Sequence, residues 1–195
     1  MNVLVAYATA HGSTKEIAQR IADRLALQIV PGTIDVLPMD GVPVLSAVPV
    51  PYHAVILGSA VHAGRWLGTA RAFLTANSGY LSQAASAGMD KAAGGATRVA
   101  VPTWAFTVGM PPTDDDLAQE EAVVGDKIRK QLPLLREHKL FRGVFDKDDV
   151  NWLFKFIMNY VVPENKQKFG DHRDWGAIES WADKVGAAIK EGGTS

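Results

Sequence analysis

The sequence contains no cysteine among its 195 residues. Without thiols, the protein cannot form a disulfide scaffold, use a cysteine nucleophile, build a thiolate zinc site or ligate an iron–sulfur cluster. Any redox chemistry of this chain therefore needs a cofactor that binds from solution.

A surplus of charge of either sign is absent too. The chain has 20 lysines and arginines against 21 aspartates and glutamates, so its formal net charge is −1 at pH 7. No long basic run occurs along the sequence. Binding to nucleic acid is disfavoured, because it depends on clustered positive charge that releases counterions from the phosphate backbone.

Motifs for metal binding and for hydrolysis are missing as well. The five histidines, at positions 11, 53, 62, 138 and 172, show no His-Glu-x-x-His spacing, so the sequence predicts no metal site. A Gly-x-Ser-x-Gly turn is not found, which leaves serine hydrolysis without support. The run Asp114-Asp115-Asp116 is interpreted as a helix start, where carboxylates suit the positive end of the helix dipole.

Long hydrophobic runs are also absent. No segment has about 20 uninterrupted apolar residues, the length that a membrane-spanning helix needs. The first residues lack the basic region and the cleavage site of a secretory signal. We therefore expect a cytoplasmic protein, in which hydrophobic residues (47%) suffice for one sizeable core.

What is present is an alternation of strand and helix patterns. Short apolar runs predict strands over residues 2–7, 33–37, 53–58, 98–103 and 140–145. Helical spacing predicts helices that begin at Ser13 and Thr113, and helices over 67–77 and 174–190. Residues 78–97, rich in Ala, Gly and Ser, are interpreted as a helix end and a surface loop. This order indicates an α/β fold over residues 1–195, a doubly wound five-stranded parallel sheet with helices on both faces.

The loop after the first strand has the composition of a phosphate site. It consists of Thr9, Ala10, His11, Gly12, Ser13 and Thr14. Three hydroxyls, a glycine that admits a close backbone approach and a helix N-terminus can bind a phosphate without lysine or arginine. Ser13 and Glu16 also have the spacing of a capping box, which predicts that their side chains cap the helix. A plain strand-to-helix turn is the alternative.

The missing motifs narrow the choice of phosphate ligand. No Gly-Lys-Ser/Thr occurs here, which disfavours a nucleoside triphosphate. No Gly-x-Gly-x-x-Gly follows the first strand, which disfavours a dinucleotide. A mononucleotide with a single phosphate is therefore expected.

Two further loops are predicted at the carboxyl ends of neighbouring strands, where ligands of such folds bind. They combine aromatic residues with glycine and are expected to hold a planar ring by stacking. Their candidate residues are Ser59, Ala60, Val61, His62 and Trp66 in one loop, and Thr103, Trp104, Ala105, Phe106 and Gly109 at the other. His62 is the candidate acid–base residue, with a solvent-exposed spacer as the alternative. For Trp66 and Phe106 the alternative role is that of core anchors.

The loop from Thr9 to Thr14 resembles the phosphate loop of the flavodoxin family. The sequence is also similar to the flavodoxin-like, menaquinone-dependent protoporphyrinogen oxidases in its Gly58-to-Gly64 loop and in Asp174-Trp175 before the last helix. This resemblance implies a flavodoxin-like fold, FMN as cofactor and oxidoreductase activity with a quinone or a redox-partner protein. Two alternatives remain: an electron-carrier flavodoxin without a substrate of its own, and a cofactor-free interaction module.

An aromatic insertion over residues 146–170 precedes the last helix and fits the same subgroup. Its segment from Trp152 to Val162 has only one charged residue, Lys155. The segment is too short to span a bilayer, so it is predicted to be either a buried core helix or a site of peripheral membrane contact.

Overall fold

The computed structural model describes residues 1–82, 101–145 and 170–192. Three predictions lie wholly or partly outside these ranges: the strand start at 98–100, the loop at 83–97 and the aromatic insertion with its segment 152–162.

The central sheet has five parallel strands in the order β2-β1-β3-β5-β6. They are β1 (Asn2–Ala8), β2 (Thr33–Pro38), β3 (Ala54–His62), β5 (Thr103–Gly109) and β6 (Leu135–Arg142). The short strand β4 (Arg65–Trp66) pairs antiparallel with β3, and β7 (Val144–Phe145) pairs with β8 (Gly170–Asp171) beside the main sheet. The predicted fold class, a doubly wound five-stranded parallel sheet, is confirmed.

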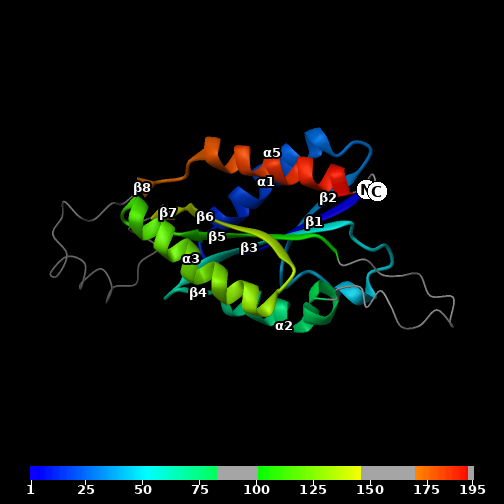
Figure 1. Cartoon of the computed structure of the whole chain (residues 1–195), viewed down its shortest axis with the longest axis horizontal. Coiled ribbons are helices and arrows are strands. Elements are labelled where there is room, and N and C mark those ends of the chain that lie inside the picture. Colours follow the sequence, from blue (N-terminus) through cyan, green and yellow to red (C-terminus); the bar gives the residue numbers. More distant parts are fainter. Residues whose placement is uncertain (83–100, 146–169, 193–195) are drawn as a thin grey trace.

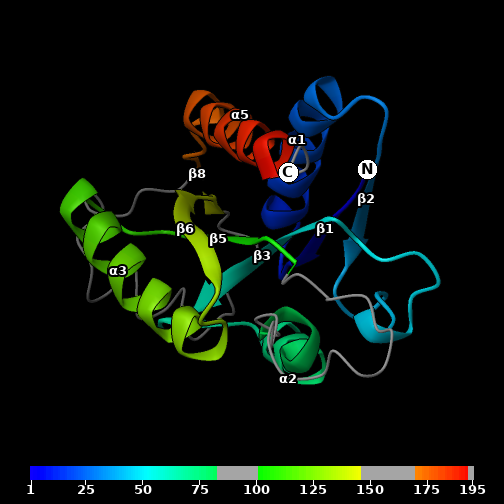
Figure 2. The same ribbon diagram turned by 45° about the vertical axis from the view of Figure 1, so that its right-hand side comes forward.

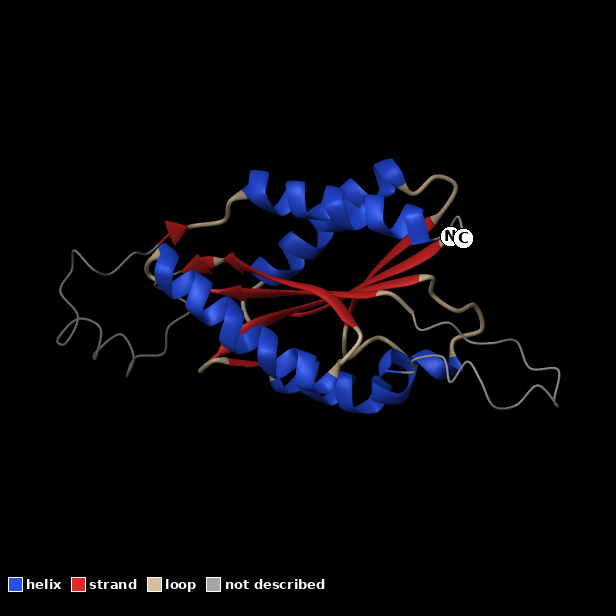
Figure 3. Cartoon of the chain, in the orientation of Figure 1, coloured by secondary structure: helices blue, strands red, loops and turns tan. Residues whose placement is uncertain are grey.

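Helices cover both faces of this sheet (Figures 1 and 3). α1 (Ser13–Gln28) and α5 (Trp175–Gly192) lie side by side on one face. α2 (Gly68–Ser82) and α3 (Asp114–Gln131) lie on the other, as the turned view in Figure 2 shows. A short 3₁₀ turn, η1 (Leu45–Ala47), packs beside α2.

Alternation along the strands divides the hydrophobic core into two layers. In β1, Val3, Val5 and Tyr7 pack in the layer that contains α1 and α5 residues. Leu4 and Ala6 point to the opposite layer, which contains α2 and α3 residues. Both sets are buried because a parallel sheet is covered on both faces, which explains why β1 is a continuous apolar run in the sequence.

Several predicted strand boundaries are wrong. β3 continues to His62 instead of ending at Gly58, and β5 continues to Gly109 instead of ending at Thr103. β6 begins at Leu135 rather than at Leu140. The predicted loops after β3 and β5 therefore consist largely of strand residues.

Gly58 marks a close contact within the sheet rather than the end of a strand. It pairs in register with Phe106 of the neighbouring β5. A Cβ atom added to Gly58 would lie 2.0 Å from the Phe106 ring. The glycine is needed because the buried aromatic ring of the adjacent strand occupies the space of a side chain.

The predicted capping box at α1 is also wrong. The N-cap residue is Gly12, and no side chain caps the helix. Glu16 turns away from the backbone and forms a hydrogen bond with Arg173. In α3 the expected start is confirmed: Thr113 is the N-cap, its hydroxyl accepts from the Asp116 amide, and three aspartates occupy the first turn.

Candidate functional site

The carboxyl ends of β1, β3 and β5 meet at one edge of the sheet, on the left in Figure 1. The loop between β1 and α1, the β3–β4 turn and the start of α3 follow these strand ends. Crevices at this edge are where doubly wound folds bind ligands. The strand topology thus places the predicted phosphate loop at the same end of the sheet as the β3–β4 turn and the end of β5.

The loop between β1 and α1 has a backbone shape that depends on glycine. Gly12 has φ 96°, in the left-handed region that favours glycine. Its amide donates a hydrogen bond of 2.9 Å to the Thr9 hydroxyl oxygen, which tightens the loop. A Cβ atom at Gly12 would have no atom within 4 Å, so the backbone here faces open space. An incoming anion can therefore approach the main chain closely.

Thr14 supplies the most informative side chain of this loop. It is fully buried in the first turn of α1, and its hydroxyl has no hydrogen-bond partner among the residues that the structure describes. A buried hydroxyl without a partner costs about 1–3 kcal/mol. The first-turn amides of α1 are also uncapped by any side chain. A buried donor beside free helix amides is the set of groups that a phosphate requires.

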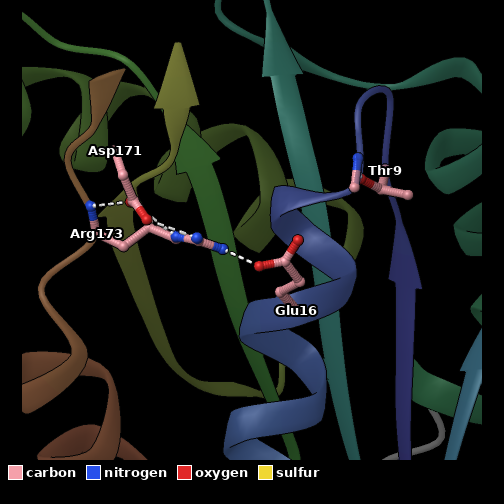
Figure 4. Close-up of polar contacts among 5 residues, drawn as sticks. Thr9, Glu16, Asp171 and Arg173 are labelled. Carbon is pink, nitrogen blue, oxygen red and sulfur yellow. Dashed lines mark hydrogen bonds and ion pairs between the residues drawn. The ribbon is translucent and has the colours of Figure 1, made fainter. Parts of the chain in front are cut away.

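An ion-paired cluster of Arg173, Asp171 and Glu16 lies beside the first turns of α1 (Figure 4). Arg173 bonds Asp171 through Nε at 2.8 Å and Nη2 at 2.6 Å, and reaches Glu16 of α1 at 2.5 Å. These two carboxylates raise the pKa of Arg173, and its hydrogen bonds lower the pKa of Asp171. The guanidinium also lies 4.6 Å from the centre of the Trp175 ring. Because its charge is already paired twice, Arg173 positions the start of α5 against α1.

The β6–β7 connection packs against the same helix start. A Cβ atom at Gly143 would lie 3.2 Å from the Ser13 hydroxyl oxygen. The Gly143 carbonyl accepts a hydrogen bond from the His172 amide at 3.1 Å. Residues far apart in the sequence therefore form one wall beside the phosphate loop.

The predicted loop after β3 is a β-hairpin. Its turn residues, Ala63 and Gly64, both have positive φ, and His62 pairs with Arg65 across the turn. Ser59 is buried, and its hydroxyl accepts from the Leu67 amide at 3.2 Å, so it serves the hairpin. Ala60 and Val61 are half-buried and His62 is exposed at the end of the strand.

Trp66 belongs to a buried hydrogen-bonded chain. Its indole N–H donates to the Thr107 hydroxyl oxygen at 2.8 Å, and Thr107 lies 2.8 Å from Nε2 of His138. Burial lowers the pKa of His138 to about 4, with Glu121 opposing the shift. The imidazole is therefore neutral near pH 7. The role of core anchor, the alternative for Trp66, agrees with its 5% exposure.

The second aromatic loop is not a loop. Thr103, Trp104, Ala105, Phe106 and Gly109 are all residues of β5, and all are buried. Trp104 and Phe106 are 3% and 0% exposed and pack in the layer with α1 and α5. The expectation that these two rings stack on a ligand is wrong, because the core encloses them. The apolar run continues past Thr103 since both faces of β5 are covered.

Glu120 is a site residue that the sequence analysis missed. It is half-buried on α3, and burial raises the pKa of its carboxyl. A Cβ atom at Gly109, the end of β5, would lie 3.3 Å from its Oε2 and 3.0 Å from Val61. The signal was helical spacing, since Glu120 shares a helix face with the buried residues Val124 and Ile128. A carboxyl whose pKa is raised by burial thus lies at the ends of β3 and β5.

Residues 1–82, 101–145 and 170–192 contain no group of three or more histidine, aspartate and glutamate side chains placed to hold a metal ion. No helix within these ranges has the length and apolar character to cross a bilayer.

Comparisons with known proteins place this fold. Residues 4–92 match a family model described as the flavodoxin domain. A search of curated proteins gives no significant match. The chain is thus similar to a flavodoxin domain over residues 4–92 and to solved flavodoxins in its fold.

Solved structures of flavodoxins share the whole fold. The chain matches a flavodoxin from the domain Archaea with a TM-score of 0.55 at 12% identity, over 97% of this chain and 99% of that one. Oxidised flavodoxin 1 from Bacillus cereus gives 0.56 at 12% identity over 98% of each chain. Rubredoxin:oxygen oxidoreductase from Desulfovibrio gigas gives 0.54 at 14% identity, over 97% of this chain but only 36% of that one.

Proposed function

We propose that this chain, which carries a flavodoxin domain match on a flavodoxin fold, binds FMN and acts as an FMN-dependent oxidoreductase. The domain match and the flavodoxin structures imply FMN as the cofactor. The fold by itself leaves the activity open, because similar sheets serve both redox enzymes and electron carriers.

The buried Thr14 hydroxyl is the observation that carries the proposal. It has no partner within the protein, and it stands beside uncapped helix amides and the left-handed Gly12. A phosphate accepts hydrogen bonds from all of these groups. The residues present thus fit an FMN phosphate, with Thr9, Ser13 and Thr14 as hydroxyl donors and Gly12 as the point of backbone approach.

The flavin ring cannot stack on Trp104 and Phe106, as the sequence suggests. Trp104 and Phe106 are enclosed in the core. The accessible groups at the strand ends are Ala60, Val61 and His62 of β3 and Met110 after β5. We assign the ring to this edge, with the hairpin and Met110 as its walls.

When bound, FMN supplies the transfer of electrons or hydride. The chain's own residues hold the phosphate, shield the ring and manage protons. Glu120, with its raised pKa, is placed at the ends of β3 and β5 to hold a proton, and His62 is exposed nearby on β3. Of the two, Glu120 is the stronger candidate because its carboxyl is half-buried and its surroundings favour the protonated form.

The finer proposal is an oxidase of the menaquinone-dependent protoporphyrinogen type, with a quinone as electron acceptor. The sequence resemblance over Gly58 to Gly64 and at Asp174-Trp175 supports it. Peripheral contact with a membrane, where quinones reside, belongs to the same proposal and rests on the sequence of residues 152–162.

An electron-carrier flavodoxin is the second candidate. It is favoured by the extent of the match, since flavodoxin chains from Archaea and Bacillus cereus are covered over 99% and 98% of their length. The two candidates differ in catalysis: only the oxidase turns over a substrate with a quinone as the final acceptor. A steady-state assay with reduced tetrapyrrole and a soluble menaquinone analogue separates them.

The cofactor is tested with purified protein. We expect a flavin absorption spectrum, or uptake of added FMN by the colourless chain. Riboflavin, which lacks the phosphate, should bind at least about a hundredfold more weakly, because each charge-assisted hydrogen bond contributes about 1.5–3 kcal/mol. Affinities for riboflavin and FMN within a few-fold of each other would overturn the phosphate site.

A further inference from the structure

A groove of about 400 Å³ lies between the β3–β4 hairpin and the helices α2 and α3. These helices cover the face of the sheet opposite α1 (Figure 2). None of the residues from Thr9 to Thr14 lines the groove. It is therefore a second concave site, separate from the proposed phosphate loop.

Positive charge surrounds the groove. Arg65, Arg71, Lys127 and Lys130 line it, and no aspartate or glutamate does. All four side chains are exposed. Within the part of the chain that the structure describes, none of them forms an ion pair. Four cations in a groove that no carboxylate lines are a local excess of positive charge in a chain whose net charge is −1.

The helix dipole adds to this charge. Arg71 lies in the first turn of α2, a turn that contains no acidic residue. A cation at a helix N-terminus is unfavourable, because the free amides already carry partial positive charge. An anion in the groove would relieve this repulsion. Lys127 contributes structure as well, since its ammonium donates to the Gly64 carbonyl at 2.8 Å and ties the hairpin to α3.

The floor of the groove is apolar. Trp66, Leu74, Val124 and Ile128 line it and are all at most 5% exposed. Its volume falls within the range of sites for small organic ligands, which runs from about 300 to 1,000 Å³. An apolar floor below a cationic rim suits a molecule with two matching parts.

We propose that this groove binds a small organic anion that carries at least two acidic groups on an apolar body. The body packs on Trp66 and Leu74, and the acidic groups pair with Arg71 of α2 and Lys130 of α3. An inorganic anion would use only the rim, and an uncharged apolar molecule would use only the floor. The groove shares no residue with the phosphate loop and meets the proposed flavin site only at the hairpin, whereas Arg71 and Lys130, which bind the acidic groups, lie on α2 and α3.

The test is an NMR titration of the full chain with three probes: naphthalene disulfonate, naphthalene monosulfonate and inorganic phosphate. The amides of residues 64–66 and 127–131 and the Trp66 indole N–H report on the groove. We expect saturable shifts at these signals, with affinity falling in the order disulfonate, monosulfonate, phosphate. The same titration with saturating FMN should give the same order of affinities at the amides of residues 127–131, which lie outside the proposed flavin site.

Two matched double variants complete the test. R71E/K130E reverses two rim charges that make no side-chain hydrogen bond in the described structure, and it should weaken disulfonate binding roughly tenfold or more. K184E/K190E makes the same change in net charge at two exposed positions of α5, on the other face, and should leave binding within about twofold.

Three outcomes overturn the proposal. They are shifts that map elsewhere, equal weakening by both double variants, and displacement of the probe by FMN. Failure to take up FMN, with groove shifts retained, would count against the proposed function alone.

Discussion

Thr14 and Thr107 are both fully buried, and they differ in what surrounds their hydroxyls. Thr107, in the middle of β5, accepts from the Trp66 indole and contacts the His138 imidazole. Thr14, in the first turn of α1, has no partner within the protein. Both are 0% exposed, so burial alone does not distinguish them.

The difference teaches where to look for a ligand. The Thr107 hydroxyl has hydrogen-bond partners on both sides, so it links the hairpin and β6 through β5 and needs no ligand. The Thr14 hydroxyl lacks a hydrogen-bond partner, and a buried polar group without one is destabilising until a ligand supplies it. The hydrogen-bonded chain of Trp66, Thr107 and His138 is thus structural, and the loop that contains Gly12 and Thr14 is the proposed phosphate site.

The largest effect is expected for Gly12→Val. Its φ of 96° disfavours a β-branched side chain, and the new methyl groups would fill the open space at the backbone. Loss of several phosphate contacts should weaken FMN binding by about 4–5 kcal/mol, more than a thousandfold. The measurement is a flavin fluorescence titration, with circular dichroism to confirm that the fold is retained. Wild-type affinity in this variant would place the ligand elsewhere.

Thr107→Val should damage the fold instead of the site. The indole N–H of Trp66 and Nε2 of His138 would both lose their partner in a buried region. We expect a loss of about 2–4 kcal/mol in the free energy of unfolding, measured by urea denaturation. FMN affinity, determined under native conditions, should stay within a few-fold. A large loss of affinity with unchanged stability would reverse the assignment of the two regions.

The same chain predicts a pH dependence of stability. Burial lowers the pKa of His138 to about 4 in the folded protein, whereas its value in the unfolded chain is 6.5. Because the folded pKa is lowered, this contribution to stability is complete above pH 6.5 and is lost as the pH falls toward 4. The loss should reach about 2 kcal/mol near pH 5.

His138→Gln provides the control for this pH effect. It should remove the dependence between neutral pH and about pH 5 while lowering the stability at all pH values. Urea unfolding curves at matched pH values measure both quantities. A wild-type slope that persists in this variant would show that other groups cause it.

The sequence predicted the polar region better than the aromatic one. The loop from Thr9 to Thr14 is made of residue types whose preferences are local: glycine for φ, hydroxyls near a helix start. Its position between β1 and α1 was therefore predictable. Trp104 and Phe106 were misassigned because burial of a ring depends on what covers the strand, and α1 and α5 come from distant parts of the chain.

Contacts between distant parts of the chain also explain wrong predictions at the start of α1 and at the end of β3. Glu16 has the spacing of a capping residue, but Arg173, 157 positions further along, takes its carboxylate. Ala63 adopts φ 50° in the hairpin turn, which alanine does not signal in a sequence. Gly58 was interpreted as a strand end, whereas the Phe106 ring of the next strand requires it. Local propensity predicts elements, and their ends depend on partners that the pattern does not reveal.

The smallest effect, and the most discriminating, is expected for Thr14→Val. The substitution keeps the shape of the side chain and removes only its hydroxyl. Since that hydroxyl has no partner within the protein, the free energy of unfolding without cofactor should stay equal or rise by up to about 1 kcal/mol. Thr107→Val, the same chemical change at equal burial, is expected to do the opposite.

Binding gives the second half of this test. Removing one hydroxyl donor from the phosphate site should weaken FMN binding about tenfold, or about 1.4 kcal/mol. Riboflavin affinity should stay unchanged in the same variant, because riboflavin has no phosphate for Thr14 to meet. If the loss is the same for both flavins, Thr14 acts on the packing of α1 and not on the phosphate. If Thr14→Val destabilises the cofactor-free protein as much as Thr107→Val does, the hydroxyl has a partner in solution and the contrast between the two threonines does not hold.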